Sequence, residues 1–378
     1  MTDVNDARRL FPILSRKAYF NTAAVAPGNT RLRDGLAAFM DLWTEEGLDF
    51  VRAEASADRA REILARLLKV SARDVALVPS VSTAAGLVAA QFVSADTGEN
   101  LIIGAQEYSS NHFPWRQLEA RGYDVRQVPF RNGGIEPDLV ESLVDGGTRL
   151  IAVSSIQTAS GHRTDISAIG AIARKVGAWL FVDGSQSVGA VSMDREMEQI
   201  DFLATSDHKF LLNAGRGMGY LYVKPDRQGE VLPLSAGWKA GNIPFQSFFG
   251  PEMNLSETAS RFDNSISWLA AIGDEICLQL MEQIGFDAIF QRNIQLGEDL
   301  RSALSASNVD CAPIPAENTS HIVSVPIGYR DPAAIQSSLQ DYGVIGSIRD
   351  QHVRLAPHFY NNKDDVAQGA SGVSLAFQ

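Results

Sequence analysis

Two apolar segments in the middle of the chain each end in polar side chains of the types that perform acid–base and Schiff-base chemistry. Trp179–Val182 precedes Asp183, and Gln186 lies three residues further on. Phe202–Thr205 precedes a second polar group, made up of Ser206, Asp207, His208 and Lys209. If both segments are strands of one parallel sheet, their carboxyl ends lie at the edge where open α/β sheets bind ligands. The sequence therefore predicts an acid, an amide, a hydroxyl, an imidazole and an amine at one site.

These groups match the requirements of pyridoxal 5'-phosphate (PLP). A buried carboxylate such as Asp183 keeps a proton on the ring nitrogen, so that the ring withdraws electrons more strongly. The aldehyde requires a lysine that can lose its proton, because only the neutral amine forms a Schiff base. The phosphate and the phenolic oxygen require hydrogen-bond donors. We therefore expect a PLP site in which Lys209 carries the cofactor.

The same stretch resembles the class V aminotransferase family of fold-type I PLP enzymes. The resemblance is carried by Asp183-Gly184-Ser185-Gln186 and by Ser206-Asp207-His208-Lys209-Phe210, and it extends over nearly the whole chain. The family includes cysteine desulfurases, kynureninase-like enzymes, isopenicillin N epimerase-like proteins and amino-acid C–S lyases. It implies an α/β fold with a mostly parallel seven-stranded sheet in a large domain and a smaller α+β C-terminal domain.

The resemblance also implies a role for each polar side chain. Lys209 would bind the cofactor covalently and later move protons. Asp183 would pair with the ring nitrogen, and Gln186 would hydrogen-bond the phenolic oxygen. Ser206 and His208 would hold the phosphate.

Further cofactor contacts are expected upstream. Ser82 and Thr83 precede the expected helix Ala84–Gln91 and match the family's phosphate loop, and a helix N-terminus attracts a dianion. Tyr108 matches the residue that stacks on the cofactor ring. Ser155 follows another expected strand and is expected to face the cofactor. Taken singly, Tyr108 could instead pack in a core, and Ser82 and Thr83 could be ordinary helix caps.

The expected substrate contacts come from the two ends of the chain. Residues 19–24 resemble the family's N-terminal active-site segment, which places Asn21 and Ala23 at the substrate. Arg354 matches the arginine that binds the substrate carboxylate, and a bidentate guanidinium suits that role better than an ammonium. The alternatives are that Asn21 forms a turn and that Arg354 belongs to a structural ion pair.

One departure from the family concerns sulfur chemistry. Cysteine desulfurases carry a nucleophilic cysteine on a loop shortly before the carboxylate-binding arginine, whereas Gly343–Asp350 contains no cysteine. Cys277 lies in an apolar helical segment and Cys311 in a proline-containing loop. Neither position matches, so persulfide chemistry is not expected.

A second departure concerns the contact between subunits. The family often has Arg-Phe-Glu-x-Gly-Thr where this chain has Arg261–Ile266, and the Gly-Thr pair usually reaches the phosphate of the neighbouring subunit. Ser265 or Ser267 could substitute for it. Because the family builds its site at a subunit interface, we expect a homodimer.

The expected activity is that of an enzyme acting on a small α-amino acid, whose amine displaces Lys209 and whose α-proton Lys209 removes. Loss of a β-substituent would make the enzyme a lyase, reprotonation at the cofactor an aminotransferase, and reprotonation at the α-carbon an epimerase. Without the desulfurase cysteine we favour a β-eliminating C–S lyase, with an aminotransferase as the main alternative. A desulfurase-like enzyme and a non-catalytic PLP-fold binding protein are further alternatives.

The elements that position these residues follow from the hydrophobic pattern, in which short apolar runs alternate with amphipathic segments as in βαβ units. The large sheet is expected to contain seven strands, at Val75–Val78, Leu101–Gly104, Asp124–Val128, Leu150–Val153, Trp179–Val182, Phe202–Thr205 and Tyr220–Val223. Two shorter strands are expected at His321–Val325 and Val353–Leu355. Helices are expected at Ala60–Leu68 with Ser56 as the N-cap, at Ile166–Val176, at Ser265–Ile284 and at Phe286–Leu304.

The domain division follows a change in composition at Leu232–Pro251, which is rich in proline and glycine. Residues 1–24 are expected to serve the small domain and the active site, residues 25–235 to form the large PLP-binding domain, and residues 236–378 the small domain. Gly215–Gly219 lacks the full spacing of a dinucleotide-binding loop and precedes a strand.

The composition excludes several other classes. The 378-residue chain has a net charge of −12, which argues against nucleic acid and anionic membranes as partners. Two cysteines and no long apolar segment lead us to expect a cytoplasmic protein. The six histidines are scattered, so no metal site is expected.

Overall fold

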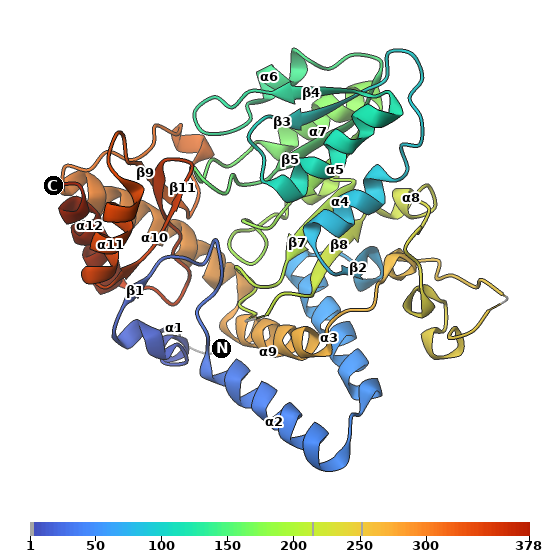
Figure 1. Cartoon of the computed structure of the whole chain (residues 1–378), viewed down its shortest axis with the longest axis horizontal. Coiled ribbons are helices and arrows are strands. Elements are labelled where there is room, and N and C mark those ends of the chain that lie inside the picture. Colours follow the sequence, from blue (N-terminus) through green and yellow to red (C-terminus); the bar gives the residue numbers. More distant parts are fainter. Residues whose placement is uncertain (1–3, 214, 251) are drawn as a thin grey trace.

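The computed structural model describes residues 4–213, 215–250 and 252–378, and its centre is a seven-stranded sheet (Figure 1). The strand order is β2-β8-β7-β6-β5-β3-β4. Strand β8 runs antiparallel to the other six strands, which are parallel to one another, so the expected mostly parallel seven-stranded sheet is confirmed. The strands are β2 (Val75–Val78), β3 (Asn100–Gly104), β4 (Asp124–Val128), β5 (Thr148–Ser154), β6 (Trp179–Asp183), β7 (Phe202–Ser206) and β8 (Gly219–Val223).

Two hydrophobic cores lie on the two faces of this sheet. Within β2, Leu77 packs with one core, whereas Ala76 and Val78 pack with the other. The first core includes helices α3 (Phe50–Leu68), α7 (Ile166–Val176) and α9 (Trp268–Ile284), and the second includes α4 (Val81–Ala89) and α5 (Phe113–Arg116). Because both faces are covered, the inner strands such as β6 and β7 are continuous apolar runs, whereas the edge strand β4 alternates buried and exposed residues.

The remaining helices before residue 230 are short or lie at the periphery. They are α1 (Val4–Arg8), α2 (Thr30–Glu46), α6 (Pro137–Glu141) and α8 (Pro225–Gln228). No helix in the described part of the chain is long and apolar enough to cross a membrane.

Three helix starts differ from the expected ones, whereas α7 has the expected bounds and α10 has the expected start at Phe286. Helix α3 begins at Phe50, where the Asp49 side chain accepts the N–H of Arg52, and the helix continues through Ser56. The expected cap at Ser56 is therefore wrong: Ala53 and Ala57 are buried, so the packed face of the helix starts a full two turns before the leucine-rich part.

The other two helix starts are set by serine caps. Helix α4 begins at Val81, three residues before the expected start, and its cap is Ser80. Helix α9 begins at Trp268 with Ser267 as its cap, so Ser265 lies outside the helix.

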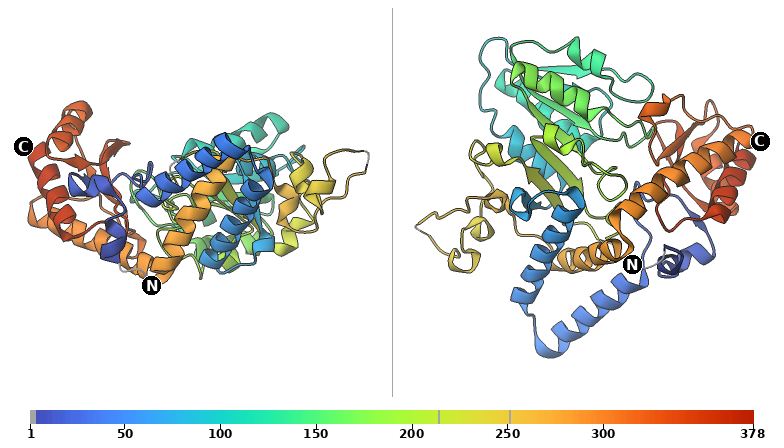
Figure 2. Two further views of the ribbon diagram at one scale, coloured as in Figure 1. Left: turned by 90° about the horizontal axis from the view of Figure 1, so that it is seen from below. Right: turned by 180° about the vertical axis from the view of Figure 1, so that it is seen from behind.

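The C-terminal part forms a second layer at one end of the molecule (Figure 2). Its antiparallel sheet has the order β11-β12-β9, and β1 pairs in parallel with β10. Ala18 and Phe20, at β1, share a core with helices α10 and α12. The elements are β1 (Ala18–Tyr19), β9 (Val323–Pro326), β10 (Val344–Ile345), β11 (Ser347–Arg349), β12 (His352–Leu355), α10 (Phe286–Ala306), α11 (Pro332–Asp341) and α12 (Lys363–Ala376).

The packing of α9 bears on the domain boundary. Its buried side chains, such as Cys277 and Leu278, belong to the same core as the large sheet. We propose to keep the three-part division and to move the last boundary from residue 236 to Gly285, which lies between α9 and α10.

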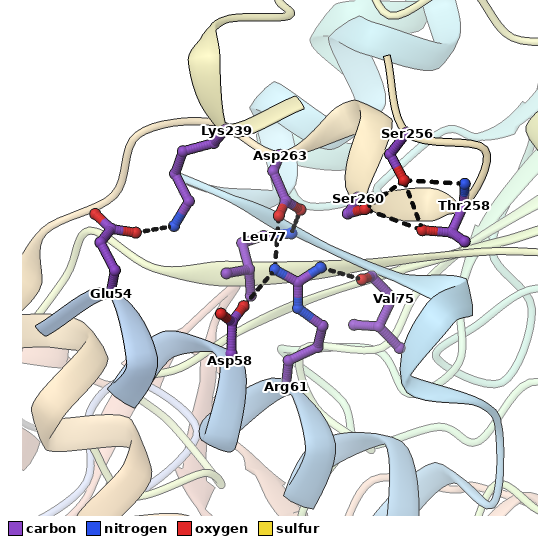
Figure 3. Close-up of polar contacts among 10 residues, drawn as sticks. All are labelled: Glu54, Asp58, Arg61, Val75, Leu77, Lys239, Ser256, Thr258, Ser260 and Asp263. Atoms are coloured by element: carbon purple, nitrogen blue, oxygen red, sulfur yellow. Dashed lines mark hydrogen bonds and ion pairs between the residues drawn. The ribbon is translucent and has the colours of Figure 1, made fainter. Parts of the chain in front are cut away.

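The crossing segment, residues 232–250, projects from the large domain beside α3 (yellow in Figure 1). Lys239 forms a buried ion pair with Glu54 of α3, which Figure 3 shows. This pair holds the base of the segment against the domain.

Candidate active site

The carboxyl ends of β5, β6 and β7 lie side by side and open into one cavity. The register pairs Ser154 with Asp183 and Asp183 with Ala204, so the residues after each strand meet at one edge of the sheet. The cavity has a volume of about 220 Å³. Its lining consists of Pro79, Ser80, Val81, Ser82, Tyr108, Ser110, Asp183, Ser185, Ser206, Asp207, His208, Lys209, Arg216, Gly217 and Met218. Six of the site residues expected from the sequence therefore line one cavity: Ser82, Tyr108, Asp183, Ser206, His208 and Lys209.

Lys209 lies at the centre of this cavity with an acid and an aromatic ring nearby. Its Nζ is 5.5 Å from the centroid of the Tyr108 ring. Burial lowers the pKa of Lys209 to about 8, Asp183 opposes this shift, and Arg354 and Arg216 add to it. A substantial fraction of the amine is therefore neutral near physiological pH, which is the form that attacks an aldehyde.

This pKa predicts how covalent attachment of PLP to Lys209 depends on pH. The rate at which borohydride-trapped cofactor accumulates on Lys209 is expected to rise with pH and to level off above about 8, because the neutral amine becomes the dominant form there. Labelling of exposed lysines is expected to keep rising toward pH ~10. Peptide mass spectrometry separates the two. A midpoint for Lys209 as high as that of the exposed lysines would contradict the assigned environment.

The loop that carries Tyr108 is fixed by its neighbour Glu107. The carboxylate of Glu107 accepts the backbone N–H of Ser154 at 2.7 Å and the side-chain amide of Gln157 at 3.0 Å, and it also accepts the Ser154 hydroxyl. Burial raises the pKa of Glu107 to about 7, which these donors oppose. The loop is thereby attached to the end of β5, and Tyr108 is left half exposed at the mouth of the cavity.

One end of the cavity offers donors for a phosphate. The N-terminus of α4 lies there with Ser80 and Ser82, beside Ser206 and His208. Ser206 Oγ and His208 Nε2 are buried and have no partner among the described residues. Arg216 also lines this cavity. Hydroxyls, an imidazole, a guanidinium and a helix N-terminus together form a donor set suited to a dianion.

Thr83 and Ser155 lie outside the lining. Thr83 donates its N–H to Ser80 Oγ at 3.1 Å, and the two hydroxyls are 2.9 Å apart. Ser155 Oγ donates to the Asp183 carbonyl oxygen at 3.1 Å and lies 2.7 Å from Ser187 Oγ. The structure thus gives Thr83 a place in the first turn of α4 and gives Ser155 a place behind Asp183, where it fixes the end of β6.

Gln186 and Arg354 are joined through Thr158. Gln186 Nε2 donates to Thr158 Oγ1 at 2.9 Å and to the Ala23 carbonyl oxygen at 3.1 Å. Arg354 donates through one Nη to Thr158 Oγ1 and to the Thr158 carbonyl oxygen, both at 2.8 Å. The free atom of the Gln186 amide is its Oε1. In this orientation the free atom of the amide is a hydrogen-bond acceptor. The predicted role of Gln186, as a donor to the phenolic oxygen, requires the amide to rotate so that Nε2 and Oε1 exchange places.

The N-terminal segment approaches the same side of the site. Asn21 forms a bridge with Ala356, which follows β12, and its Oδ1 is buried without a partner among the described residues. Ala23 holds Gln186 through its carbonyl oxygen. Arg354 itself is buried, its Nε has no partner in the described chain, and burial lowers its pKa to about 9. The guanidinium therefore stays charged at neutral pH, and roles at the substrate remain predictions for all three residues.

Several site residues were not expected from the sequence. Ser80 caps α4 and lines the cavity, but the expected helix start three residues later hid its position. Arg216 lies in the glycine-rich segment Gly215–Gly219, whose only known pattern to compare was a dinucleotide-binding loop, and that pattern assigns no role to the arginine. Thr158 carries no motif, and its role depends on two partners that are 28 and 196 positions away in the chain.

Neither cysteine belongs to the site. Cys277 is buried in α9, where its Sγ–H donates to the Leu212 carbonyl oxygen at 3.2 Å, and burial raises its pKa well above the usual range. Cys311 lies before β9 and is half-buried. No cysteine lines the cavity, and no cluster of three or more His, Cys, Asp or Glu suited to a metal occurs, within the ranges that the structure describes.

The fold and this cavity define a PLP-dependent enzyme of the α/β type. The Aminotransferase class-V model matches residues 49–353, and the chain belongs to that family. The family's cofactor is PLP, and the site suits it: Asp183 for the ring nitrogen, Lys209 for the aldehyde, and unpartnered donors for the phosphate.

Similar proteins are named for several activities. The chain is 28% identical to a probable cysteine desulfurase of Methanothermobacter thermautotrophicus, over 96% of this chain and 95% of that one. It is 24% identical to the uncharacterized aminotransferase YcbU of Bacillus subtilis, over 95% and 94%. The structure of the cystine C–S lyase C-DES superposes with a TM-score of 0.84 at 20% identity, covering 96% of this chain and 99% of that one. The last likeness concerns the fold alone.

Proposed function

We propose that this PLP-dependent enzyme is a β-eliminating lyase that cleaves the C–S bond of a cysteine conjugate. The observation that carries the proposal is that Lys209 lies in a cavity with no thiol in its described lining, while Arg354 is near enough to lower the pKa of Lys209. A desulfurase needs a cysteine to accept sulfur, whereas a C–S lyase releases the sulfur with its leaving group. The names of the desulfurase and C–S lyase relatives support sulfur-containing substrates.

The residues of the chain have separate tasks in this reaction. Bound PLP supplies an aldehyde that condenses with amines and a ring that accepts electrons. Arg354 binds the α-carboxylate of the substrate and Asp183 holds the positive charge at the ring nitrogen. Lys209 takes the α-proton at Nζ, and the thiolate then leaves from the β-carbon and gains a proton. With one water molecule, the cysteine conjugate yields a thiol, pyruvate and ammonia.

Product analysis tests this proposal against its main alternative, an aminotransferase. The PLP-loaded protein is incubated with cystine and S-alkylcysteines, with and without a keto acid. A thiol or persulfide together with pyruvate in the absence of a keto acid supports the lyase. Turnover that requires a keto acid identifies an aminotransferase, as the name of the Bacillus relative suggests. Loss of optical purity without either product identifies an epimerase, and no reaction with any amino acid favours the binding protein.

The proposed task of Arg354 predicts a defect in substrate binding. In Arg354→Ala, KM for the amino acid is expected to rise about 10²-fold, because charge-assisted hydrogen bonds to the carboxylate are lost. The kcat should change less than KM. Steady-state kinetics measure both, and Arg174→Ala serves as the control because Arg174 is exposed on α7, away from the site. An unchanged KM would assign carboxylate binding elsewhere.

We propose that the enzyme is a homodimer in which a second copy of the chain covers the crossing segment. Exposed apolar side chains lie on this segment, just after it and at the start of α3, where Phe50 packs against Phe245: Leu232, Leu234, Ile243, Phe245, Phe248, Phe249, Met253, Phe50 and Val51. Soluble monomers seldom expose so many in one place. Ser265 and Ser267 are exposed, and Ser267 lies against the cavity residue Gly217, where a partner chain would complete the phosphate end.

The dimer predicts the effect of a single charge in this surface. Phe249 is 91% exposed, so Phe249→Asp leaves the fold of one chain intact. The variant is expected to have the mass of one chain, 41.0 kDa, in light scattering, whereas the unaltered protein has twice that mass. Tyr329→Asp is the control, since Tyr329 is equally exposed in the C-terminal part. A dimeric Phe249→Asp protein would place the interface elsewhere.

A further inference from the structure

Two buried acids adjoin the phosphate end of the cavity and have no task in the proposed reaction. Asp207 precedes His208, Asp274 lies on α9, and both are fully buried. Asn213 Nδ2 donates to Asp207 Oδ2 at 3.2 Å, and the Tyr220 hydroxyl donates to Asp274 Oδ2 at 2.7 Å. The other carboxyl oxygen of Asp207, Oδ1, is 3.1 Å from His208 Nδ1. Asp207 and Asp274 are called the acid pair below.

The surroundings of the acid pair favour its neutral form. Burial raises the pKa of both acids, and Asp207 raises that of Asp274 further. The groups around the pair include an amide, a phenol, backbone N–H groups and the thiol of Cys277, which are all neutral at pH 7. Two neighbouring carboxyls without a paired cation cannot both ionise inside a protein. At least one acid of the pair therefore holds a proton at neutral pH, and a proton on Asp207 Oδ1 lies opposite His208 Nδ1.

That proton decides which nitrogen of His208 bears a hydrogen. Burial lowers the pKa of His208 to about 4, with Lys209 and Arg216 adding to the shift, so its ring is neutral and carries one N–H. A protonated Asp207 donates to Nδ1, which leaves the hydrogen on Nε2. An ionised Asp207 would accept from Nδ1 and leave a lone pair on Nε2. Nε2 is the buried nitrogen without a partner among the described residues.

We propose that Asp207 is a positioning residue that, as a neutral acid, fixes His208 with its hydrogen on Nε2 and so presents an N–H donor to an oxyanion in the cavity. The proposal rests on the proposed role of His208 at the phosphate, and it holds for any of the reactions considered above. Asp274 and Tyr220 support it by keeping Asp207 buried among neutral groups. Asp274 on α9 thereby influences, through Asp207, the N–H donor that His208 presents to the cavity.

Two variants of Asp207 separate this role from a merely structural one. In Asp207→Asn, the carboxamide can still donate to Nδ1, whereas Asp207→Ala has no donor. The apo-protein is labelled with 15N-histidine, and the tautomer of His208 is read from its two ring nitrogen shifts, assigned by the missing signal in His208→Gln. Binding of inorganic phosphate to the same apo-proteins is measured by calorimetry.

The expected result is hydrogen on Nε2 in the unaltered protein and in Asp207→Asn, and a mixture of tautomers in Asp207→Ala. Phosphate affinity should be kept in Asp207→Asn and fall about 10-fold to 100-fold in Asp207→Ala, because one N–H donor to a charged group is lost. Hydrogen on Nδ1 in the unaltered protein, or equal phosphate affinity of the two variants, would overturn the proposal.

The same measurements distinguish failure of this inference from failure of the proposed function. If His208→Gln binds phosphate as tightly as the unaltered protein, then the role of His208 at the phosphate is wrong and the proposal for Asp207 is overturned with it. If instead the product analysis shows no C–S cleavage, the ring shifts and phosphate affinities of the apo-protein are unaffected.

Discussion

Lys209→Ala is expected to lower turnover by at least about 10²–10⁴-fold, the range that a lost general base alone produces. The loss should be at the upper end, because the same side chain attaches the cofactor and removes the α-proton. In the structure no other lysine lines the described cavity wall, so no second amine can substitute for it. Turnover is measured by pyruvate release, or by transamination if that proves to be the reaction.

A covalent label supplies an independent measurement. Borohydride treatment of the PLP-loaded protein is expected to mark the peptide that contains Lys209, and Lys209→Ala should give no such peptide. Lys175→Ala is the matched control, because Lys175 is exposed and pairs only with the exposed Glu141. Full turnover by Lys209→Ala, or a label on another lysine in the unaltered protein, would falsify the assignment of this site.

The sequence predicted the sheet well because its strands are buried on both faces. Runs such as Phe202–Thr205 are apolar throughout, and each observed strand begins and ends within two residues of its expected bounds. Helix starts were harder to predict. Helix α3 begins at Phe50 although its first half contains many charged residues, because small alanines pack against α9 and polar side chains face outward.

The residues of the candidate site also fall into a predictable and an unpredictable group. Asp183, Ser206, His208 and Lys209 were predictable because each follows a strand within a short sequence span, and the structure brings all four into one cavity. Contacts between distant parts of the chain were not predictable. The acid pair joins residues 67 positions apart, and its second member, Asp274, lies on an apolar helix face where pattern alone favours a hydrophobic side chain.

Asp263, within the segment Arg261–Ile266, had no physical role assigned from the sequence, although this segment was compared with the family pattern. Strand β2 lies at the edge of the large sheet, and residues from this sequence cover its free side. Asp263 Oδ1 accepts the N–H of Leu77 at 2.8 Å, and the N–H of Asn264 donates to the Leu77 carbonyl oxygen at 2.9 Å. Figure 3 shows that Asp263 also accepts a hydrogen bond from Arg61 of α3, at 2.6 Å.

Arg61 completes the cover of this edge. Its second Nη donates to the Val75 carbonyl oxygen at 3.2 Å, so Arg61 and Asp263 together satisfy backbone groups of β2 that no strand pairs. Both side chains are at least nine-tenths buried. Strand β2 leads directly into Ser80 and the N-terminus of α4, and the ion pair therefore also supports the phosphate end of the cavity.

Asp263→Ala is consequently expected to lower the free energy of unfolding by about 3–5 kcal/mol, because it leaves Arg61 charged and buried and exposes an unpaired N–H of β2. A typical protein has only about 5–15 kcal/mol in total, so the variant should unfold at a much lower denaturant concentration. Glu141→Ala breaks the exposed pair with Lys175 and should cost less than about 1 kcal/mol.

The double variant Asp263→Ala, Arg61→Leu separates the two causes. Removing the buried charge should recover part of the lost stability, since much of the penalty comes from a buried guanidinium left with only the exposed Asp58 as its acidic partner. If Arg61→Leu lowers the free energy of unfolding by the same amount in Asp263→Ala as in the unaltered protein, the two side chains contribute independently. The main contribution of Asp263 is then its hydrogen bond to Leu77. If Asp263→Ala is as stable as Glu141→Ala, the edge of β2 is held by the β8 pairing alone, and the ion pair contributes nothing to the position of α4.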